Sequence, residues 1–195
     1  MYHPISTEEV LRENAAYEAR INEAEDALSR RGFPRTAIFR QPVVWGEHDQ
    51  YQHVNNAHYI RWFESARMRW MERMSRTLSP EIASNLVRGR GVGIILASTY
   101  CRYRRPVTYP DTVVIGQAAL PMKFADRVTV RSQAYSVAQS AIVAEADFEC
   151  VAYDYDRLCK ASLPPEVADA LRAWTYTGED KEPYCQKTSR RRTVS

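Results

Sequence analysis

The chain has 195 residues, of which 45% are hydrophobic and 26% charged, a balance that suits one sizeable globular domain with extensions. Its 27 basic and 24 acidic residues leave a formal net charge of +3, which argues against a nucleic-acid-binding protein. No apolar run approaches the roughly 20 residues that span a bilayer, so we expect no membrane partner. The four cysteines form no C-x-x-C pair. We therefore expect an intracellular protein of a reducing compartment, the cytoplasm first and the mitochondria as the alternative.

The first expected element is an amphipathic helix over residues 7–30. Ser6 and Glu9 have the spacing of a capping box, and apolar residues then recur at helical steps. Gly32 and Pro34 end this helix. We assign residues 1–36 to an N-terminal helical extension of the domain that follows.

The main domain is expected over residues 37–174. Residues 37–45 read as its first strand, and residues 56–74 as a long helix with apolar side chains on more than one side. A helix of this kind is typical of one that a sheet encloses.

Strands are expected over 93–105, 112–120, 127–135 and 142–152. In the last of them apolar residues alternate with Glu145, Asp147 and Glu149, so one face should be buried and the other should meet solvent or a partner. A short helix ends near Trp174, and residues 175–195 read as a basic, disordered tail. The order predicts an α+β fold, with a curled antiparallel sheet around one long central helix.

A carboxylate and a polar turn stand directly before the long helix. Asp49 follows an apolar run, and the free backbone N–H groups of the helix begin about seven residues later, at Asn55 and Asn56. A carboxylate that faces a helix N-terminus is the arrangement of an acyl-transfer site, because the N–H groups can hold an oxyanion.

These residues resemble the hotdog-fold acyl-CoA thioesterases of the 4-hydroxybenzoyl-CoA thioesterase type. The family pattern is Asp-x-x-x-His-Val-Asn-Asn-x-x-Tyr followed by Glu-x-Ala-Arg, met here by Asp49, His53, Val54, Asn55, Asn56, Tyr59, Glu64, Ala66 and Arg67. The overall resemblance is closest to fungal thioesterase-like proteins, which share Val-Val-Trp-Gly-Glu and a later Val-x-Tyr-Asp-Tyr. The chain departs from many relatives at Gln52, where they have glycine, and glutamine tolerates a positive φ poorly.

The resemblance implies a hotdog fold and hydrolysis of an acyl-CoA thioester to free acid and coenzyme A, with no cofactor beyond the coenzyme A of the substrate. It assigns Asp49 as base or nucleophile, Asn56 with Asn55 as the oxyanion-holding helix start, and His53 as a residue that orients the carboxylate or the thioester. The structural alternatives are a turn aspartate, a helix cap and a hydrogen-bonding histidine.

Substrate contacts are expected at two places. Tyr59 and Phe63 should line the acyl pocket. The phosphates of coenzyme A should meet a basic cluster, because guanidinium groups bind phosphate well; its members are Arg102, Arg104, Arg105 and Lys123. The alternative for this cluster is a solvated, charge-protected sheet edge.

Two other readings of the polar residues carry less weight. Glu64 and Arg67 have the spacing of an ordinary helical ion pair, with Glu64 as the reserve candidate for a catalytic carboxylate. The histidines 48, 53 and 58 lack the three- or four-residue spacing of helical metal ligands, so we expect no metal site.

Members of the family assemble as homodimers or homotetramers with the active site at the subunit boundary, and we expect the same here. A second hypothesis is a catalytically silent hotdog subunit with a structural or binding role, motivated by the N-terminal helix and the basic tail. A hydratase or dehydratase is a third, weaker alternative, because the histidine and aspartate motif of those enzymes is not found. Pocket depth, and hence the acyl chain, does not follow from the sequence.

Overall fold

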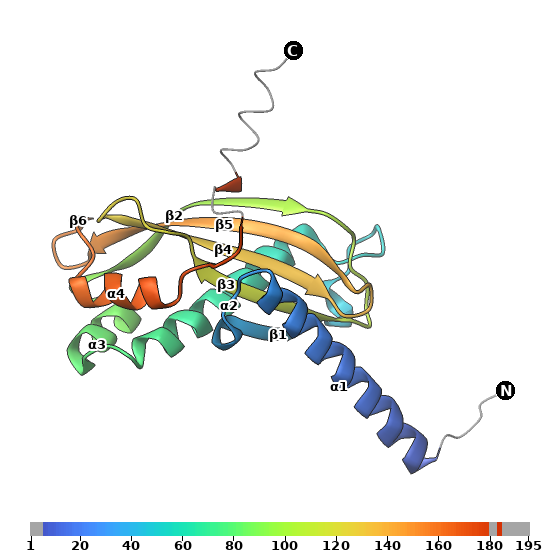
Figure 1. The fold of residues 1–195 in the computed structure, drawn as a ribbon. Helices are drawn as coiled ribbons and strands as arrows, with labels where there is room; N and C mark the ends of the chain where they lie inside the picture. Colours follow the sequence, from blue (N-terminus) through green and yellow to red (C-terminus); the bar gives the residue numbers. More distant parts are fainter. Residues whose placement is uncertain (1–5, 180–182, 185–195) are drawn as a thin grey trace.

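The structure is a computed structural model that describes residues 6–179 and 183–184. These residues form an α+β fold in which a curled antiparallel sheet wraps around a long helix (Figure 1). The strands follow the order β1-β3-β4-β5-β2, and β6 pairs with β5. Their bounds are β1 Ile38–Pro42, β2 Val92–Tyr103, β3 Thr112–Ala119, β4 Arg127–Ser136, β5 Ala141–Asp154 and β6 Cys159–Lys160. The predicted fold class is confirmed.

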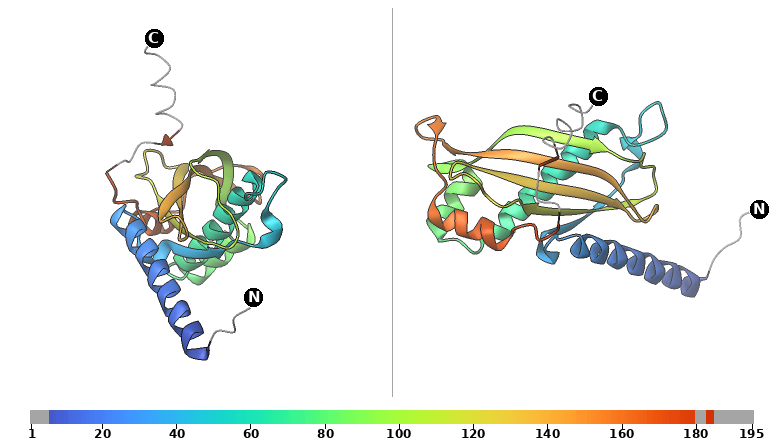
Figure 2. Two further views of the ribbon diagram at one scale, coloured as in Figure 1. Left: turned by 90° about the vertical axis from the view of Figure 1, so that its right-hand side faces the viewer. Right: turned by 45° about the horizontal axis from the view of Figure 1, so that its top comes forward.

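Helix α2, Asn56–Ser75, lies in the hollow of the curled sheet (Figure 2). Its buried side is rich in aromatic and aliphatic residues, namely Tyr59, Trp62, Phe63, Ala66, Trp70 and Met74. They share one core cluster with inward-facing residues of β3, β4 and β5 such as Ile115, Val130 and Phe148. Burial of this face is the main source of stability for the helix. The prediction of a helix enclosed by a sheet is therefore confirmed.

Helix α1, Thr7–Arg30, begins at the predicted capping box of Ser6 and Glu9. Its second half covers the outer face of the sheet, where Ile21, Ala24 and Leu28 join a second apolar cluster. Its first half projects past the sheet (Figure 1), and residues 7–20 are exposed. The helix is thus an extension that is anchored to the domain at one end.

Two short helices and two 3-10 turns complete the described elements. Helix α3, Pro80–Arg88, was not predicted, and α4 spans Pro165–Ala173. The 3-10 turns are η1, Arg35–Ala37, and η2, Trp45–Glu47. The first strand ends at Pro42, earlier than predicted, and η2 begins three residues later.

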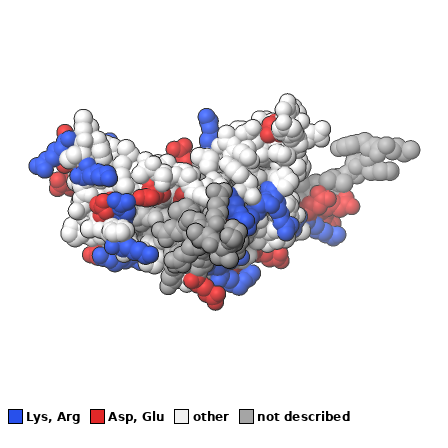
Figure 3. All heavy atoms as spheres, turned by 90° about the horizontal axis from the view of Figure 1, so that it is seen from above, with Lys and Arg blue, Asp and Glu red and all other residues white. Residues whose placement is uncertain are grey.

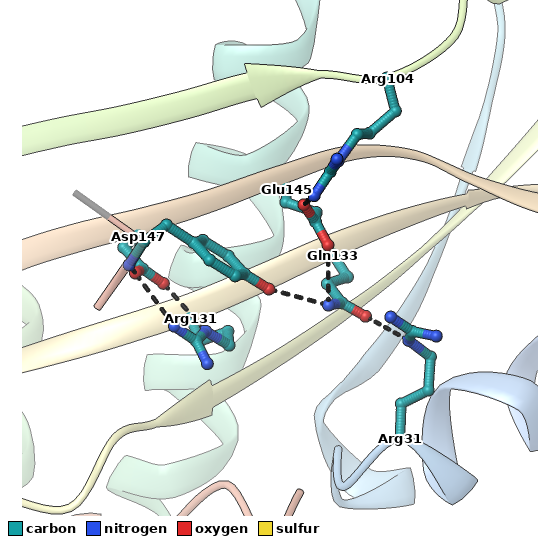
Figure 4. A network of polar contacts seen from close by, with 7 residues as sticks. Arg31, Arg104, Arg131, Gln133, Glu145 and Asp147 are labelled. Atoms are coloured by element: carbon teal, nitrogen blue, oxygen red, sulfur yellow. Dashed lines mark hydrogen bonds and ion pairs between the residues drawn. The ribbon is translucent and has the colours of Figure 1, made fainter. Parts of the chain in front are cut away.

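The outer face of β4 and β5 carries a network of polar contacts (Figure 4). Arg131 and Asp147 form an ion pair of 3.1 Å in which both side chains are almost fully buried. The backbone N–H of Tyr184 donates to Asp147 at 2.6 Å, and the Arg131 guanidinium lies 4.0 Å from the centre of the Tyr184 ring. Glu145, Asp147 and Glu149 were expected to meet solvent or a partner. Glu145 and Asp147 are instead buried within the chain, whereas the side chain of Glu149 is 41% exposed.

A segment near the C-terminus also differs from the prediction. Thr175 pairs with Ala119, and the N–H of Tyr176 donates to the carbonyl of Ala119 at 2.7 Å. The Tyr176 ring is buried against Phe33, with ring centres 5.1 Å apart. The expectation of disorder is wrong for residues 175–179, where one buried aromatic ring outweighs the polar composition. The expected tail over 180–182 and 185–195 lies outside the described residues.

The surface seen from above carries lysine, arginine, aspartate and glutamate side chains in mixed positions (Figure 3). Interspersed charges of this kind form no extended basic stripe on the visible face. Among the described residues, no helix is both long enough and apolar enough to cross a bilayer.

Candidate active site

The turn that carries Asp49 is closed by backbone hydrogen bonds. The N–H of Asp49 donates to the carbonyl of His53, and the N–H of Gln52 donates back to the carbonyl of Asp49, both at 3.0 Å. A bridge between His48 and Val54 fastens the base of the turn. Gln52 has φ +63°, which places it in the left-handed region that favours glycine. Glutamine therefore adopts this backbone conformation at an energetic cost.

Replacing Gln52 with glycine should stabilise the fold by about 0.5–1 kcal/mol. The substitution removes a left-handed penalty of about 1–2 kcal/mol, part of which the greater chain entropy of glycine offsets. Urea unfolding of Gln52→Gly and of the control Gln52→Ala measures the effect, because alanine shortens the side chain without removing the penalty. Equal free energies of unfolding for the two variants would contradict this account.

Helix α2 presents a free N–H group at its start. Asn55 is the N-cap, and its side-chain oxygen accepts the N–H of Ala57 at 2.9 Å. The N–H of Asn55 itself donates to the carbonyl of Glu47 at 3.0 Å. Within the described part of the chain, no acceptor bonds the N–H of Asn56. This N–H and the positive end of the helix are able to hold an oxyanion.

The Asp49 carboxylate lies beside this helix start. One oxygen accepts the N–H of Tyr51 at 2.8 Å, and the other accepts from the Asn55 side-chain amide at 3.4 Å. The nearest ring nitrogen of His53 is 4.0 Å away. The bond to Tyr51 is that of an Asx turn, so the carboxylate also shapes its own turn. The structure thus brings together Asp49, His53, Asn55 and Asn56.

Glu47, for which no role was predicted, holds the turn against the helix. Its carboxylate accepts from the indole N–H of Trp62 at 2.9 Å and from the N–H of Val44 at 2.8 Å. A ring nitrogen of His58 is 3.7 Å away. Glu47 therefore joins the loop to the second turn of α2. In the sequence, Glu47 stands three residues after Val44, which is the spacing at which a glutamate side chain accepts a backbone N–H earlier in the chain.

An open groove of about 320 Å³ adjoins the helix start. Its lining comes from the helix start and from the end of β2: His53, Val54, Asn56, Tyr59, Tyr103, Arg104, Arg105 and Pro106. The hydroxyl of Tyr103 donates to the carbonyl of Asn56 at 3.2 Å. Burial raises the pKa of both Tyr59 and Tyr103 to about 12, so these phenols stay protonated at neutral pH. Neither Asp49 nor Asn55 lines the groove, and the lining residue nearest to the Asp49 carboxylate in the contacts given above is His53, at 4.0 Å.

Some of the predicted substrate residues lie elsewhere. Phe63 is a core residue whose ring packs edge-on against Phe148, with centres 5.9 Å apart. Lys123 lines a separate hollow of about 400 Å³ on the outer face of the sheet. Arg102 is exposed on β2 and does not line the groove. Local spacing along the chain did not reveal these separations, because they depend on which face of the sheet each side chain takes.

The remaining predicted arginines have different surroundings. Arg104 pairs with Glu145 on the outer face, through its Nε at 2.7 Å, and also lines one end of the groove. Arg105 lines the groove, and its carbonyl accepts the hydroxyl of Tyr59 at 3.5 Å. Of the predicted basic cluster, only Arg104 and Arg105 therefore line the groove beside the helix start. Tyr103 lies between Arg102 and Arg104 in the sequence. It was not predicted as a groove residue, because Asn56, whose carbonyl accepts its hydroxyl, is remote along the chain.

The helical pair of Glu64 and Arg67 is present at 3.9 Å, with Arg67 buried and Glu64 exposed. Arg67 also lies over the Phe148 ring, 4.8 Å from its centre. This arrangement is structural and leaves Glu64 outside the groove. In the described residues no group of three or more histidine, cysteine, aspartate or glutamate side chains is arranged to hold a metal ion.

Comparison with known proteins adds the family. Residues 43–171 match the model of the thioesterase-like superfamily. Similar solved structures include a protein from Pseudomonas aeruginosa strain PAO1, with 22% identity, coverage of 73% of this chain and 93% of that chain, and a TM-score of 0.61. A 1,4-dihydroxy-2-naphthoyl-CoA thioesterase from Synechocystis has 16% identity, coverage of 69% and 94%, and a TM-score of 0.58.

A gentisyl-coenzyme A thioesterase has 15% identity to this chain, coverage of 69% of this chain and 98% of its own, and a TM-score of 0.56. At such identities the likeness establishes the fold. The family match covers the Asp49 turn, α2 and the whole sheet except β1. The chain therefore belongs to the thioesterase-like superfamily and has its hotdog fold.

Proposed function

We propose that the protein is an acyl-CoA thioesterase that hydrolyses a thioester to free acid and coenzyme A. The observation that carries this proposal is the unbonded N–H of Asn56 at the start of α2, beside a carboxylate and an open groove. Acyl transfer needs a donor for the developing oxyanion and a group that activates the nucleophile. The N–H of Asn56 and the carboxylate of Asp49 can supply them, and both belong to the turn and the helix start that follows it.

In the proposed reaction, the N–H of Asn56 holds the carbonyl oxygen of the thioester as negative charge develops on it. If Asp49 acts as a base, it takes a proton from the attacking water, the carbon–sulfur bond breaks, and this proton passes to the leaving sulfur, so that coenzyme A leaves as the thiol and the free acid remains. If Asp49 acts as a nucleophile, it attacks the carbonyl carbon and expels the coenzyme A thiolate; water then hydrolyses the acyl–aspartate anhydride, which releases the free acid and supplies the proton of the thiol. His53 would orient the carboxylate, since its ring Nδ1 is 4.0 Å from an oxygen of Asp49.

The proposed substrate is an acyl-CoA. Two of the similar structures are named as thioesterases of coenzyme A esters. In this chain Arg105, which lines the groove, is the cation best placed for a coenzyme A phosphate, because Arg104 is paired with Glu145. Free thiols at Cys101, Cys150 and Cys159 agree with a place in the cytoplasm.

We further propose that a second copy pairs with strand β2. This strand lies at the end of the sheet order, and it is bonded on one side only, to β5. Ile95 and Leu96 are exposed near its middle, and an exposed apolar edge strand is a template for pairing with another chain. The groove lies at the end of the same strand, so the partner would border the active site.

The variant Leu96→Lys should convert the dimer to a monomer at micromolar concentration, because a charged side chain opposes pairing along the edge. Size-exclusion chromatography with light scattering measures the change. The control Leu158→Lys introduces the same charge at an exposed leucine in the turn after β5. A wild type that is monomeric, or a control that dissociates equally, would refute pairing through β2.

A silent binding subunit is the second candidate function. It is favoured by the hydrogen bond of Asp49 to Tyr51, since a turn aspartate needs no catalytic task. Release of thiol from butyryl-, benzoyl- and decanoyl-CoA by the wild-type protein decides between the two candidates. Turnover above the buffer rate supports the thioesterase. Binding of these esters without turnover supports the silent subunit.

A further inference from the structure

The space behind the groove, between α2 and the sheet, is filled by large side chains. Trp62 and Phe63 lie one turn further along α2 than Tyr59, and all three are almost fully buried. Further along the helix, Trp70 and Met74 are equally buried. An acyl chain that entered from the groove and continued under the helix would have to displace these residues. Interiors packed to this density do not yield such space without a large cost.

Two tyrosine rings stand where the groove meets this packed interior. Tyr59 and Tyr103 both line the groove and meet edge-to-face, with ring centres 5.3 Å apart. On its far side Tyr59 contacts Trp62, with centres 5.0 Å apart. The ring pair is thus supported from behind, by the next turn of the same helix.

Both rings are also held by their hydroxyl groups. The hydroxyl of Tyr103 donates to the carbonyl of Asn56 at 3.2 Å, and the hydroxyl of Tyr59 reaches the carbonyl of Arg105 at 3.5 Å. Since Asn56 carries the N–H proposed for the oxyanion, the ring of Tyr103 is tied to the residue that would hold the thioester carbonyl. Asn56, Tyr59 and Tyr103 line the same groove, so an acyl group held at the N–H of Asn56 would lie beside the ring pair.

We propose that Tyr59 and Tyr103 form the end wall of the acyl site and restrict it to compact acyl groups, either short chains or a single ring. This inference rests on the proposed function and adds its substrate class. A compact acyl group would contact the two rings through its apolar surface, and an aryl group would meet them in the edge-to-face or offset manner that aromatic rings prefer. A long alkyl chain would be left in water or would have to break the wall.

Turnover of butyryl-, benzoyl- and decanoyl-CoA by the wild type and by Tyr59→Ala tests the wall. The wild type should have a kcat/KM for butyryl- or benzoyl-CoA at least about tenfold above that for decanoyl-CoA, since a filled pocket discriminates by about tenfold or more for each methylene that does not fit. In Tyr59→Ala the space of the lost ring opens into the groove. The ratio should then shift toward decanoyl-CoA by at least about tenfold.

Met74→Ala is the matched control. It also removes a buried side chain from α2, but it lies 15 residues further along the helix, about 22 Å from Tyr59 by the helical rise. This variant should be destabilised and yet keep the wild-type ratio. A shift of the same size in Met74→Ala, or an unchanged ratio in Tyr59→Ala, would overturn the assignment of the wall. So would a wild type that accepts decanoyl-CoA as well as butyryl-CoA.

Binding of non-hydrolysable thioether analogues keeps this inference separate from the proposed function. The S-butyl, S-benzyl and S-decyl ethers of coenzyme A are probes of the same site that do not need turnover. Suppose that the wild type hydrolyses no ester but binds the first two probes at least about tenfold more tightly than the third. This result would support the end wall and refute the thioesterase activity. Equal affinity for the three probes would overturn the wall whatever the activity.

Discussion

Replacing Asp49 with asparagine should lower kcat for acyl-CoA hydrolysis by about 10²–10⁴-fold. This is the range that a general base contributes, and a lost carboxylate nucleophile costs at least as much. Asparagine keeps an oxygen that can accept the N–H of Tyr51, now bonded at 2.8 Å, so the turn should persist. The loss should therefore appear in turnover and not in folding, and thiol release at saturating substrate measures it.

The control for this variant is Asp169→Asn. Asp169 is an exposed residue of α4 that is paired with Arg172, far in sequence from the turn. Circular dichroism and thermal unfolding establish that both variants are folded like the wild type. A fall of less than about tenfold in kcat for a folded Asp49→Asn would remove the carboxylate from the mechanism and leave its role in the Asx turn.

Replacing Asp147 with alanine should destabilise the fold by about 3–5 kcal/mol. The change removes one partner of a buried ion pair, and breaking a buried pair in this way is strongly destabilising. Burial tends to lower the pKa of Arg131, but the hydrogen bond and charge of Asp147 outweigh it and raise the pKa. The substitution also removes the acceptor for the N–H of Tyr184. Urea unfolding measures the loss.

Two further variants separate burial from charge in this prediction. Asp169→Ala breaks an exposed pair and should cost at most about 1 kcal/mol. The double change Arg131→Met with Asp147→Leu removes both charges, and should recover much of the loss of Asp147→Ala, because apolar residues of similar volume often replace a buried ion pair at little cost. A loss of about 1 kcal/mol or less in Asp147→Ala would show that the buried pair adds little to stability.

Elements set by neighbours in sequence were predictable. The capping box of Ser6 and Glu9 marked the start of α1, and the N-cap preference of asparagine marked the start of α2. The alternation in β5 gave the inward face, because a strand turns successive side chains to opposite sides. The resemblance pointed to the turn at Asp49, and the structure places His53, Asn55 and the free N–H of Asn56 around it.

Contacts between remote segments were not predictable. Tyr103 lies 47 residues from Asn56, and nothing in its neighbourhood marks it as part of a groove. The polar face of β5 looked solvated because the partners of Asp147 come from β4 and from Tyr184. Tyr176 stood in a polar stretch, and only the apolar cluster with Phe33 shows why it is buried. Such contacts depend on single aromatic residues, and the hydrophobic periodicity of the sequence does not predict them.

The central claim is that the turn at Asp49 and the start of α2 form a thioesterase site. Turnover of butyryl-CoA and affinity for its S-butyl thioether analogue, measured side by side in the wild type and Asp49→Asn, test it most directly. The account predicts wild-type turnover, a loss of at least about 10²-fold in kcat for the variant, and equal affinity for the analogue within about twofold. A wild type that binds the analogue without hydrolysing any ester, or a variant that hydrolyses as fast as the wild type, would contradict it.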